Sequence, residues 1–257
     1  MIDVHCHLEA KDYDPDRNQV IEKCRKELKA VITSCTHPRD FQLTMKLVEN
    51  FKGFVFASVG FHPEYVKEAR EKEIDDYIEL IKENKDKIVS IGEVGLDKFW
   101  IKESEWQEKQ KEIFKKFIDF AKEIKKPLTI HSRDAYEDAV KILEQEDAKK
   151  VHLHLFGDNK LVKRVAENNW YISIGPIVLR SKKHFQIVRD MPLELLLLET
   201  DSPWNHPKVF TEHIALRNDP TSVKFVAERI AEIKKISLEE VDKITTENAI
   251  KLFELPL

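Results

Sequence analysis

The sequence predicts an α/β protein of the (β/α)8 TIM-barrel class, with residues 1–257 in a single domain. Three observations favour this class. Short apolar runs alternate with longer amphipathic segments, the units recur at roughly 30-residue intervals, and the chain of 257 residues has the length of such a barrel. An open doubly wound sheet is the structural alternative. The sequence contains no Gly-x-Gly-x-x-Gly and no Gly-Lys-Ser/Thr phosphate loop, which weakens that alternative.

Eight short runs are expected to be strands because apolar and β-branched residues dominate them. The run at residues 195–198 is apolar at consecutive positions, as expected for a strand that is buried on both faces. The expected strands are Ile2–His5, Ala30–Ser34, Phe54–Val59, Ile88–Ile91, Leu128–His131, Val151–His154, Tyr171–Ile174 and Leu195–Glu199.

Segments with helical periodicity lie between most of these strands and after the last one. Apolar residues in Lys72–Asn84 and Glu105–Ile124 recur at spacings of three and four, which places them on one helix face. Val223–Ile233 and Leu238–Phe253 are expected to be the final two helices. The second begins at Ser237 and has Glu240 three residues later, which is the pattern of a capping box.

The overall charge restricts how the protein can bind other molecules. The 43 Lys and Arg residues nearly balance the 47 Asp and Glu residues, and the net charge is −4. Attraction of the whole chain to nucleic acid or anionic lipid is therefore excluded as the main source of affinity. A phosphate-bearing substrate would have to be held by local cations or by metal ions.

Cysteine usage and the absence of apolar segments predict a cytoplasmic protein with no membrane association. Three cysteines in so long a chain do not form a disulfide framework, which favours a reducing compartment. No apolar run approaches the roughly 18 residues that a membrane span needs, and the N-terminus lacks a basic start.

Histidines and carboxylates fall at the ends of the expected strands. His5 and His7 end the first strand, Glu93 follows the fourth, and three more residues occupy equivalent positions, namely His131, His154 and Asp201. In a barrel these carboxyl ends converge on one rim, where the active site of this architecture lies. Joint placement at strand ends is much harder to obtain by chance than a single buried histidine.

Four imidazoles and two carboxylates form a nitrogen and oxygen site that suits zinc or another first-row divalent ion. Six ligands exceed what one tetrahedral ion needs, and two ions that share Glu93 as a bridge would use them all. The predicted cofactors are therefore two divalent ions: Zn, Mg or Mn. Other histidines lack this placement and are expected to be surface or packing residues, namely His37, His184 and His213.

Two neighbours of the expected ligands are predicted to have structural roles. Cys6 lies between His5 and His7 in the sequence, but its side chain points to the opposite face of the strand. His152 faces the same way as His154 but lies roughly 6.6 Å deeper in the barrel, at about 3.3 Å rise per residue. His152 is therefore expected to be buried and hydrogen-bonded.

The sequence resembles the TatD-type metal-dependent deoxyribonucleases, within the wider amidohydrolase-like barrels. The resemblance runs nearly end to end and is carried by seven segments: Asp3-Val-His-Cys-His7, Gly60-Phe-His-Pro63, Gly92-Glu-Val-Gly-Leu-Asp97, His131-Ser-Arg133, His154-Leu-Phe156, Glu199-Thr-Asp-Ser-Pro203 and Arg217-Asn-Asp-Pro220. Singly they are moderately specific, but seven in this order are highly specific. The sequence departs from the family pattern at Leu155, Lys98 and Trp204-Asn-His206, which bears on substrate preference more than on metal binding.

The resemblance implies roles for individual residues. His5, His7, Glu93 and Asp201 would bind one ion, whereas Glu93, His131 and His154 would bind the other. The phosphate-binding part of the cleft would be lined by His62, Arg133 and Arg217.

The ligand set supports hydrolysis by a metal-activated water, whose proton Asp201 or the nearby Glu199 would accept. Further rim cations are expected at Lys98, Arg180, Lys182 and Lys183, although a solvated turn is the favoured explanation for the last two. Four aromatic residues follow strand ends and would either stack on unpaired bases or pack against the rim loops, namely Phe61, Trp100, Phe156 and Trp204.

Three functions remain open from the sequence. The favoured one is an exonuclease that trims single-stranded or frayed DNA ends, with DNA as its partner. The second is a hydrolase of an amide, lactone or ester, such as D-aminoacyl-tRNA, on the same site. Glu93 stands where a carbamylated lysine would have favoured the second. The third is a non-catalytic, metal-bearing binding protein, against which the complete ligand set argues.

Overall fold

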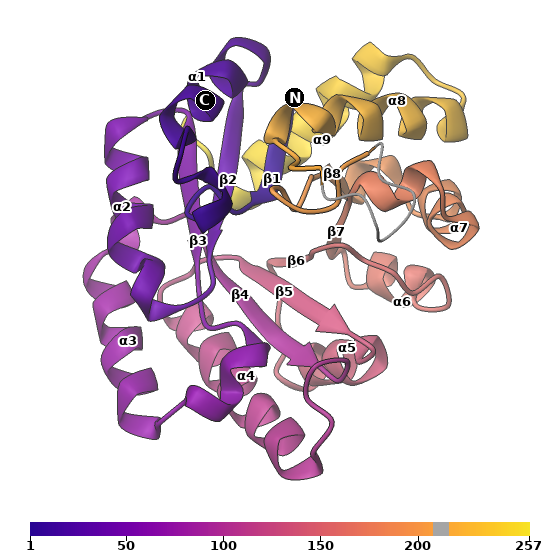
Figure 1. The fold of residues 1–257 in the computed structure, drawn as a ribbon. Helices are drawn as coiled ribbons and strands as arrows, with labels where there is room; N and C mark the ends of the chain where they lie inside the picture. Colours follow the sequence, from indigo (N-terminus) through magenta and orange to yellow (C-terminus); the bar gives the residue numbers. More distant parts are fainter. Residues whose placement is uncertain (208–215) are drawn as a thin grey trace.

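The computed structural model describes residues 1–207 and 216–257. Within these residues, eight parallel strands pair in sequence order and curve into a barrel with helices around it (Figure 1). The expected (β/α)8 class is confirmed. The strands are β1 (Ile2–Cys6), β2 (Ala30–Cys35), β3 (Val55–Val59), β4 (Ser90–Asp97), β5 (Leu128–Arg133), β6 (Val151–Leu153), β7 (Tyr171–Ile174) and β8 (Leu196–Leu198).

Backbone hydrogen bonds join the first and last strands just beyond their carboxyl ends. The amide of Asp201 donates to the carbonyl of His5 at 2.9 Å, and the amide of His7 donates to the carbonyl of Ser202 at 2.8 Å. These bonds bring the start of the chain and the turn after β8 together. Three of the expected ligands therefore meet at this seam.

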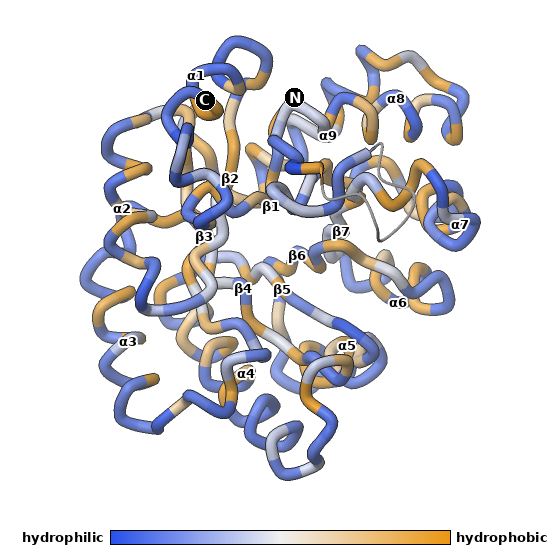
Figure 2. Tube along the Cα trace, viewed as in Figure 1, coloured by the Kyte–Doolittle hydropathy of each residue, from blue (hydrophilic) through white to orange (hydrophobic). Residues whose placement is uncertain are grey.

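The helices lie outside the barrel, and Figure 2 shows apolar and polar residues alternating along them. All four helices expected individually from the sequence are present, and Ser237 accepts a hydrogen bond from the amide of Glu240 at 3.1 Å, as a capping residue should. The helices of the described residues are α1 (Arg17–Glu27), α2 (Phe41–Asn50), α3 (Glu71–Glu83), α4 (Ser104–Glu123), α5 (Tyr136–Gln145), α6 (Val162–Glu167), α7 (Lys182–Asp190), α8 (Val223–Lys234) and α9 (Leu238–Phe253). None of them is long and apolar enough to cross a membrane.

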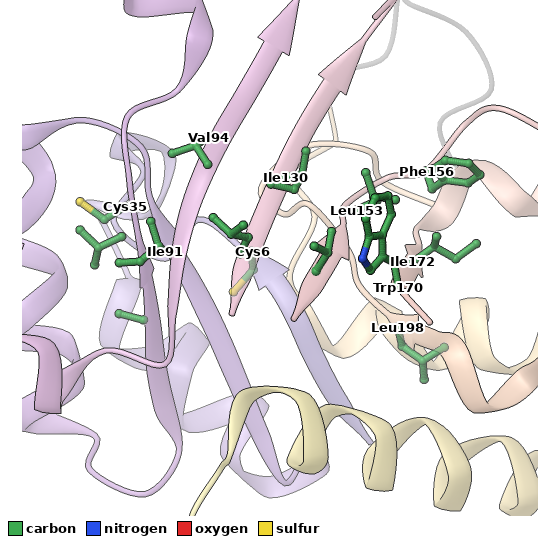
Figure 3. Packing of buried hydrophobic residues seen from close by; sticks show 14 of the residues in the cluster. Cys6, Cys35, Ile91, Val94, Ile130, Leu153, Phe156, Trp170, Ile172 and Leu198 are labelled. Carbon is green, nitrogen blue, oxygen red and sulfur yellow. The ribbon is translucent and has the colours of Figure 1, made fainter. Parts of the chain in front are cut away.

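Two apolar clusters hold the barrel together. The larger lies between the strands and the surrounding helices, and Figure 3 shows part of it, including Cys6, Phe156 and Trp170. The smaller joins the amino ends of strands, for example at Ile2 and Val89, to Leu252 and Phe253 of helix α9. Apolar packing thus fills the amino end of the barrel, and the carboxyl end is left for polar side chains.

The position of Glu93 differs from the expected one. The sequence placed it after the fourth strand, but β4 begins later and continues to Asp97, so Glu93 lies inside the strand. The pairing of β4 with β5 shifts between Ile91 and Val94, as at a β-bulge. A Cβ atom at Gly92 or Gly95 would collide with a carbonyl oxygen of β5, so only glycine permits this close approach around Glu93.

Candidate metal centre

Seven polar side chains converge at the carboxyl end of the barrel. They come from six of its strands or from the segments that directly follow them: His5, His7, His62, Glu93, His131, His154 and Asp201. Six of the seven line one cleft. The seventh, His5, lies beneath it and is fully buried. The six ligands expected from the sequence are therefore brought together, and His62 lies beside them.

One group of ligand atoms surrounds one oxygen of Glu93, Oε2. His5 Nε2 lies 3.3 Å from this oxygen and 3.7 Å from Asp201 Oδ1. His7 Nε2 lies 3.3 Å from Asp201 Oδ1 and 3.9 Å from Glu93 Oε2. Two imidazole nitrogens and two carboxylate oxygens thus face one small volume.

A second group surrounds the other oxygen of Glu93, Oε1. His131 Nδ1 lies 2.7 Å and His154 Nε2 lies 2.8 Å from this oxygen, and the two nitrogens are 3.3 Å apart. The two oxygens of one carboxylate therefore face two different sets of histidines. This is the arrangement that a bridging ligand requires.

The second ring nitrogen of each expected ligand histidine faces an oxygen atom. His131 Nε2 lies 2.9 Å from Asp97 Oδ2, and His7 Nδ1 lies 3.0 Å from Glu9 Oε1. His5 Nδ1 is oriented in the same way by Ser34 Oγ at 3.1 Å, whereas His154 Nδ1 lies 3.5 Å from Glu199 Oε2 and makes no hydrogen bond there. Such partners fix the ring orientation of metal-binding histidines and raise their basicity.

The donor set fits divalent ions. His5 Nε2 is fully buried and has no hydrogen-bond partner, and an unpaired polar atom of this kind is costly unless a ligand satisfies it. Three overlapping groups of side chains have ligand atoms close enough to hold an ion: His5, His7 and Glu93; His5, His154 and Glu199; and His62, Glu93 and His131. Imidazole and carboxylate ligands suit zinc and neighbouring transition metals, and carboxylates also suit Mg²⁺ and Mn²⁺.

The electrostatics of the cluster favour positive charge around Glu93. Burial acts to raise the pKa of this carboxyl, but the imidazoles of His154, His5 and His62 hold its pKa well below the ordinary value. Burial acts to lower the pKa of His154, yet Glu93 and Glu199 raise that pKa well above its ordinary value. A metal cation between these groups would be stabilised by the same carboxylate charges.

His62 differs from the other histidines of the centre because a backbone amide fixes its tautomer. The amide of Glu64 donates to His62 Nδ1 at 3.2 Å, so the neutral ring carries its hydrogen on Nε2. Nε2 points toward Glu93 Oε1, 3.5 Å away, and toward His131 Nδ1, 3.1 Å away. This tautomer makes His62 a hydrogen-bond donor at the centre, with no free electron pair on Nε2 for a metal.

Comparison with known proteins identifies the family. A model of the family described as TatD related DNase matches residues 2–254. The chain belongs to the TatD-related DNase family. It is 35% identical over 263 residues to the human deoxyribonuclease TATDN3, covering 98% of this chain and 94% of that protein. It is 37% identical over 262 residues to YabD, an uncharacterized metal-dependent hydrolase of Bacillus subtilis, covering 99% of both chains.

A solved structure shares the TatD fold over the whole chain. YJJV, a TatD homolog from Escherichia coli, superposes with a TM-score of 0.90, covers 100% of this chain and 98% of its own, and is 23% identical. A TatD family hydrolase from Entamoeba histolytica gives a TM-score of 0.89 at 20% identity, covering 98% of this chain and 97% of its own. These likenesses concern the fold.

The cleft above the TatD-type centre has a volume of 710 Å³. Of the three residues that the resemblance assigned to phosphate binding, His62 and Arg133 line it. Arg217 does not. Its guanidinium pairs with Asp16 at 2.6 Å and lies over the ring of Tyr13 instead.

Glu199 is also placed differently from one of its expected roles. The sequence offered it as an alternative to Asp201 for accepting the proton of water, but Glu199 is fully buried and does not line the cleft. It accepts hydrogen bonds from the Leu155 amide and the Ser173 hydroxyl, both at 2.7 Å, and lies behind His154. Asp201, the other candidate, lines the cleft.

The aromatic residues expected at the rim separate into two pairs. Phe61 and Phe156 are buried in the core, so the alternative of packing is the correct one for both. Trp100 and Trp204 are exposed and line the cleft. Of the expected cations, Lys98 pairs with Asp138, whereas Arg133 and Lys183 line the cleft.

The remaining predictions about single residues have clear outcomes. His152 is fully buried and hydrogen-bonds with Ser173 Oγ at 2.6 Å, as expected for a residue deeper in the barrel. Cys6 points away from the ligands into the core, also as expected. His37 packs between aromatic rings, His184 is buried at the edge of the cleft, and His213 lies outside the described residues.

Sequence reasoning missed the side chains that orient the ligands, namely Asp97, Glu9 and Ser34. Asp97 had a detectable signal, because it ends the motif that contains Glu93. Glu9 and Ser34 had none, since their contacts depend on how β1 and β2 pair.

Proposed function

We propose that this protein is a divalent-metal-dependent deoxyribonuclease that hydrolyses phosphodiesters at single-stranded or frayed DNA ends, most simply as an exonuclease. The observation that carries the proposal is the division of Glu93, whose two oxygens face separate groups of histidines. Family membership and the deoxyribonuclease relatives in human and mouse support the reaction. The alternating barrel over residues 1–257 acts as a single catalytic domain.

Two divalent ions fit this ligand set. His5, His7, Glu93 and Asp201 would hold one, and Glu93, His131 and His154 would hold the other. When bound, such a pair supplies a hydroxide near neutral pH and stabilises charge on the attacking and leaving oxygens.

Asp201 is the group in this chain that would accept the proton from the attacking water. Burial acts to raise the pKa of its carboxyl, but the hydrogen bond and charge of His7 hold the pKa below its ordinary value. The carboxylate is therefore ionised at neutral pH and able to act as a base. Asn205 Nδ2 donates to Asp201 Oδ2 at 2.8 Å and fixes the carboxylate in the cleft.

His62 and Arg133 would bind the phosphate. The N–H at His62 Nε2 is directed into the centre by the tautomer described above. Arg133 lines the cleft with its guanidinium over the ring of Phe99 and has no ion pair among the described residues, so its charge can meet an anion. Planar guanidinium groups bind phosphate oxygens in a bidentate fashion.

The charge of the cleft favours a short contact with a strand end. Among the described residues, Arg133 and Lys183 are its only Lys or Arg side chains, and the protein as a whole carries a net charge of −4. A duplex binder relies on many phosphate contacts, which this cleft lacks. The three free, buried cysteines agree with a cytoplasmic location.

Metal analysis combined with turnover tests the proposal. The purified protein should hold two equivalents of Zn²⁺, Mn²⁺ or Mg²⁺ and shorten a 5′-labelled single strand step by step. A chelator should abolish turnover, and the added metal should restore it. Full activity in a metal-stripped preparation, or turnover of esters and amides with none of DNA, would refute it.

A further inference from the structure

Two tryptophans stand exposed at the rim of the cleft. Trp100 is 58% exposed and Trp204 is 50% exposed, whereas the chain's other tryptophans, Trp106 and Trp170, pack against the core. Both exposed rings line the cleft above the metal centre. Large aromatic surface left in water beside a catalytic centre calls for a ligand that covers it.

The two tryptophans come from opposite sides of the barrel. Trp100 follows β4 and Trp204 follows β8, and these strands are four positions apart in the order of eight (Figure 1). The ligand groups on β1, β4, β5 and β6 lie between them at the same end of the barrel. A chain that crosses the centre from one wall to the other would therefore meet one tryptophan on each side.

Each tryptophan is held in place through the residues of the centre. The amide of Trp100 donates to Asp97 Oδ1 at 2.7 Å, and the other oxygen of Asp97 holds the ligand His131. The amide of Trp204 donates to the carbonyl of Asp201 at 3.1 Å, and its ring lies 4.9 Å from that of His7. Both tryptophans are thus positioned relative to the residues of the centre.

Arg133 extends the wall that carries Trp100. Its guanidinium lies 3.8 Å from the ring centre of Phe99 and 5.5 Å from that of Trp100, and Phe99 meets Trp100 edge to face at 4.8 Å. A cation beside an exposed aromatic face offers a phosphate contact next to a stacking surface. A nucleotide presents both a base and a phosphate, so it could use the two contacts together.

We propose that Trp100 and Trp204 each stack on an unpaired nucleobase, one on either side of the phosphodiester held at the metal centre. The inference rests on the proposed function and adds how the bases of the substrate are bound. With so few cations in the cleft, base stacking supplies affinity that phosphate contacts do not. Aromatic rings stack on every base, so the grip is independent of sequence, but it requires bases that are free of a partner strand.

Steady-state hydrolysis by the metal-loaded protein tests the stacking role. The substrates are a short single-stranded oligodeoxythymidylate and the same backbone with abasic residues. Trp100→Ala and Trp204→Ala should each raise KM for the first roughly 10-fold, with kcat little changed, while Phe variants at both positions keep most of the affinity. On the abasic substrate, the wild-type protein should lose affinity and the Ala variants should lose none further.

Phe225→Ala is the matched control, because Phe225 is 45% exposed on helix α8 and does not line the cleft. It should leave KM unchanged. The inference is overturned if the Trp variants bind both substrates as the wild type does, if they weaken both equally, or if Phe225→Ala gives the same loss. Metal content of each variant is measured alongside and should stay at the wild-type value.

A binding measurement separates failure of this inference from failure of the proposed function. The wild-type protein in excess chelator is titrated with each oligonucleotide, and tryptophan fluorescence is recorded. Quenching by the base-bearing strand alone supports stacking even if the loaded protein hydrolyses neither strand. Hydrolysis that is insensitive to bases and to both tryptophans upholds the nuclease and overturns the stacking role.

Discussion

At the scale of single residues, Glu93 differs from every other expected ligand because its two oxygens face different groups of histidines. Oε2 faces His5 at 3.3 Å, while Oε1 faces His131 at 2.7 Å and His154 at 2.8 Å. The remaining ligands each belong to one side. The consequence of removing a side chain should therefore depend on which side of Glu93 it occupies.

Glu93→Gln is expected to weaken binding at both metal positions and to cost more activity than any other single ligand substitution. A neutral amide removes the charge that both ions share, whereas His131→Ala removes one ligand from one ion. Atomic-emission analysis of purified variants should find both equivalents reduced in Glu93→Gln and about one retained in His131→Ala. A smaller loss of activity in Glu93→Gln than in His131→Ala would argue against bridging.

At the scale of elements, the site residues at strand ends could be predicted from the sequence. Positions that depend on a bulge, a side-chain direction or a loop could not. The ligands were predictable because carboxyl ends of parallel strands meet at one rim. The bulge that places Glu93 inside β4 was not, since it depends on the close approach of β4 to β5. The positions of Glu199 and Arg217 depend on side-chain direction and loop conformation, which periodicity does not specify.

Strand β6 and the residue that follows it separate a ligand from a structural histidine. His154 contacts Glu93 at the rim, whereas His152 hydrogen-bonds with Ser173 and meets the ring of Phe253 at 5.7 Å in the barrel interior. His154→Ala should remove about one metal equivalent and keep the fold. His152→Ala should keep its metal and lose roughly 1–3 kcal/mol of unfolding free energy, as expected when buried partners are left unpaired.

Metal analysis and urea unfolding of these two variants measure both effects. The opposite result, with metal lost from His152→Ala and retained in His154→Ala, would mean that the assignment of ligand and core residue on this strand is reversed.

Helix α7 provides a prediction about pH. Burial, with Lys183 and Arg180 nearby, lowers the pKa of His184 from 6.5 to about 4. The unfolded chain then binds a proton that the folded chain excludes, so this stabilisation is present above about pH 6.5 and is lost as pH falls toward 4. Between pH 7 and 5 the wild type should lose about 2 kcal/mol more unfolding free energy than His184→Gln.

Urea unfolding of both proteins at the two pH values measures this difference. The ligand histidines are common to both chains, so their titration cancels in the comparison. Equal losses in the two proteins would show that His184 is readily protonated in the folded state.

At the scale of the whole molecule, the charge distribution determines how binding responds to salt. The net charge is −4, Lys98 and Arg217 are paired with carboxylates, and two Lys or Arg side chains line the cleft in the described part of the chain. Each phosphate that a protein cation neutralises releases counterions and steepens the dependence of affinity on salt. Single-strand binding should therefore show a slope of log affinity against log salt concentration on the order of one to three, measured by KM at increasing KCl.

Arg133→Ala should make this slope shallower by about one unit with metal content unchanged. Arg217→Ala should leave the slope as it is, because the guanidinium of Arg217 is already paired with Asp16. A slope as steep as that of a protein that grips many phosphates of a duplex would contradict the short, metal-centred contact inferred from this cleft.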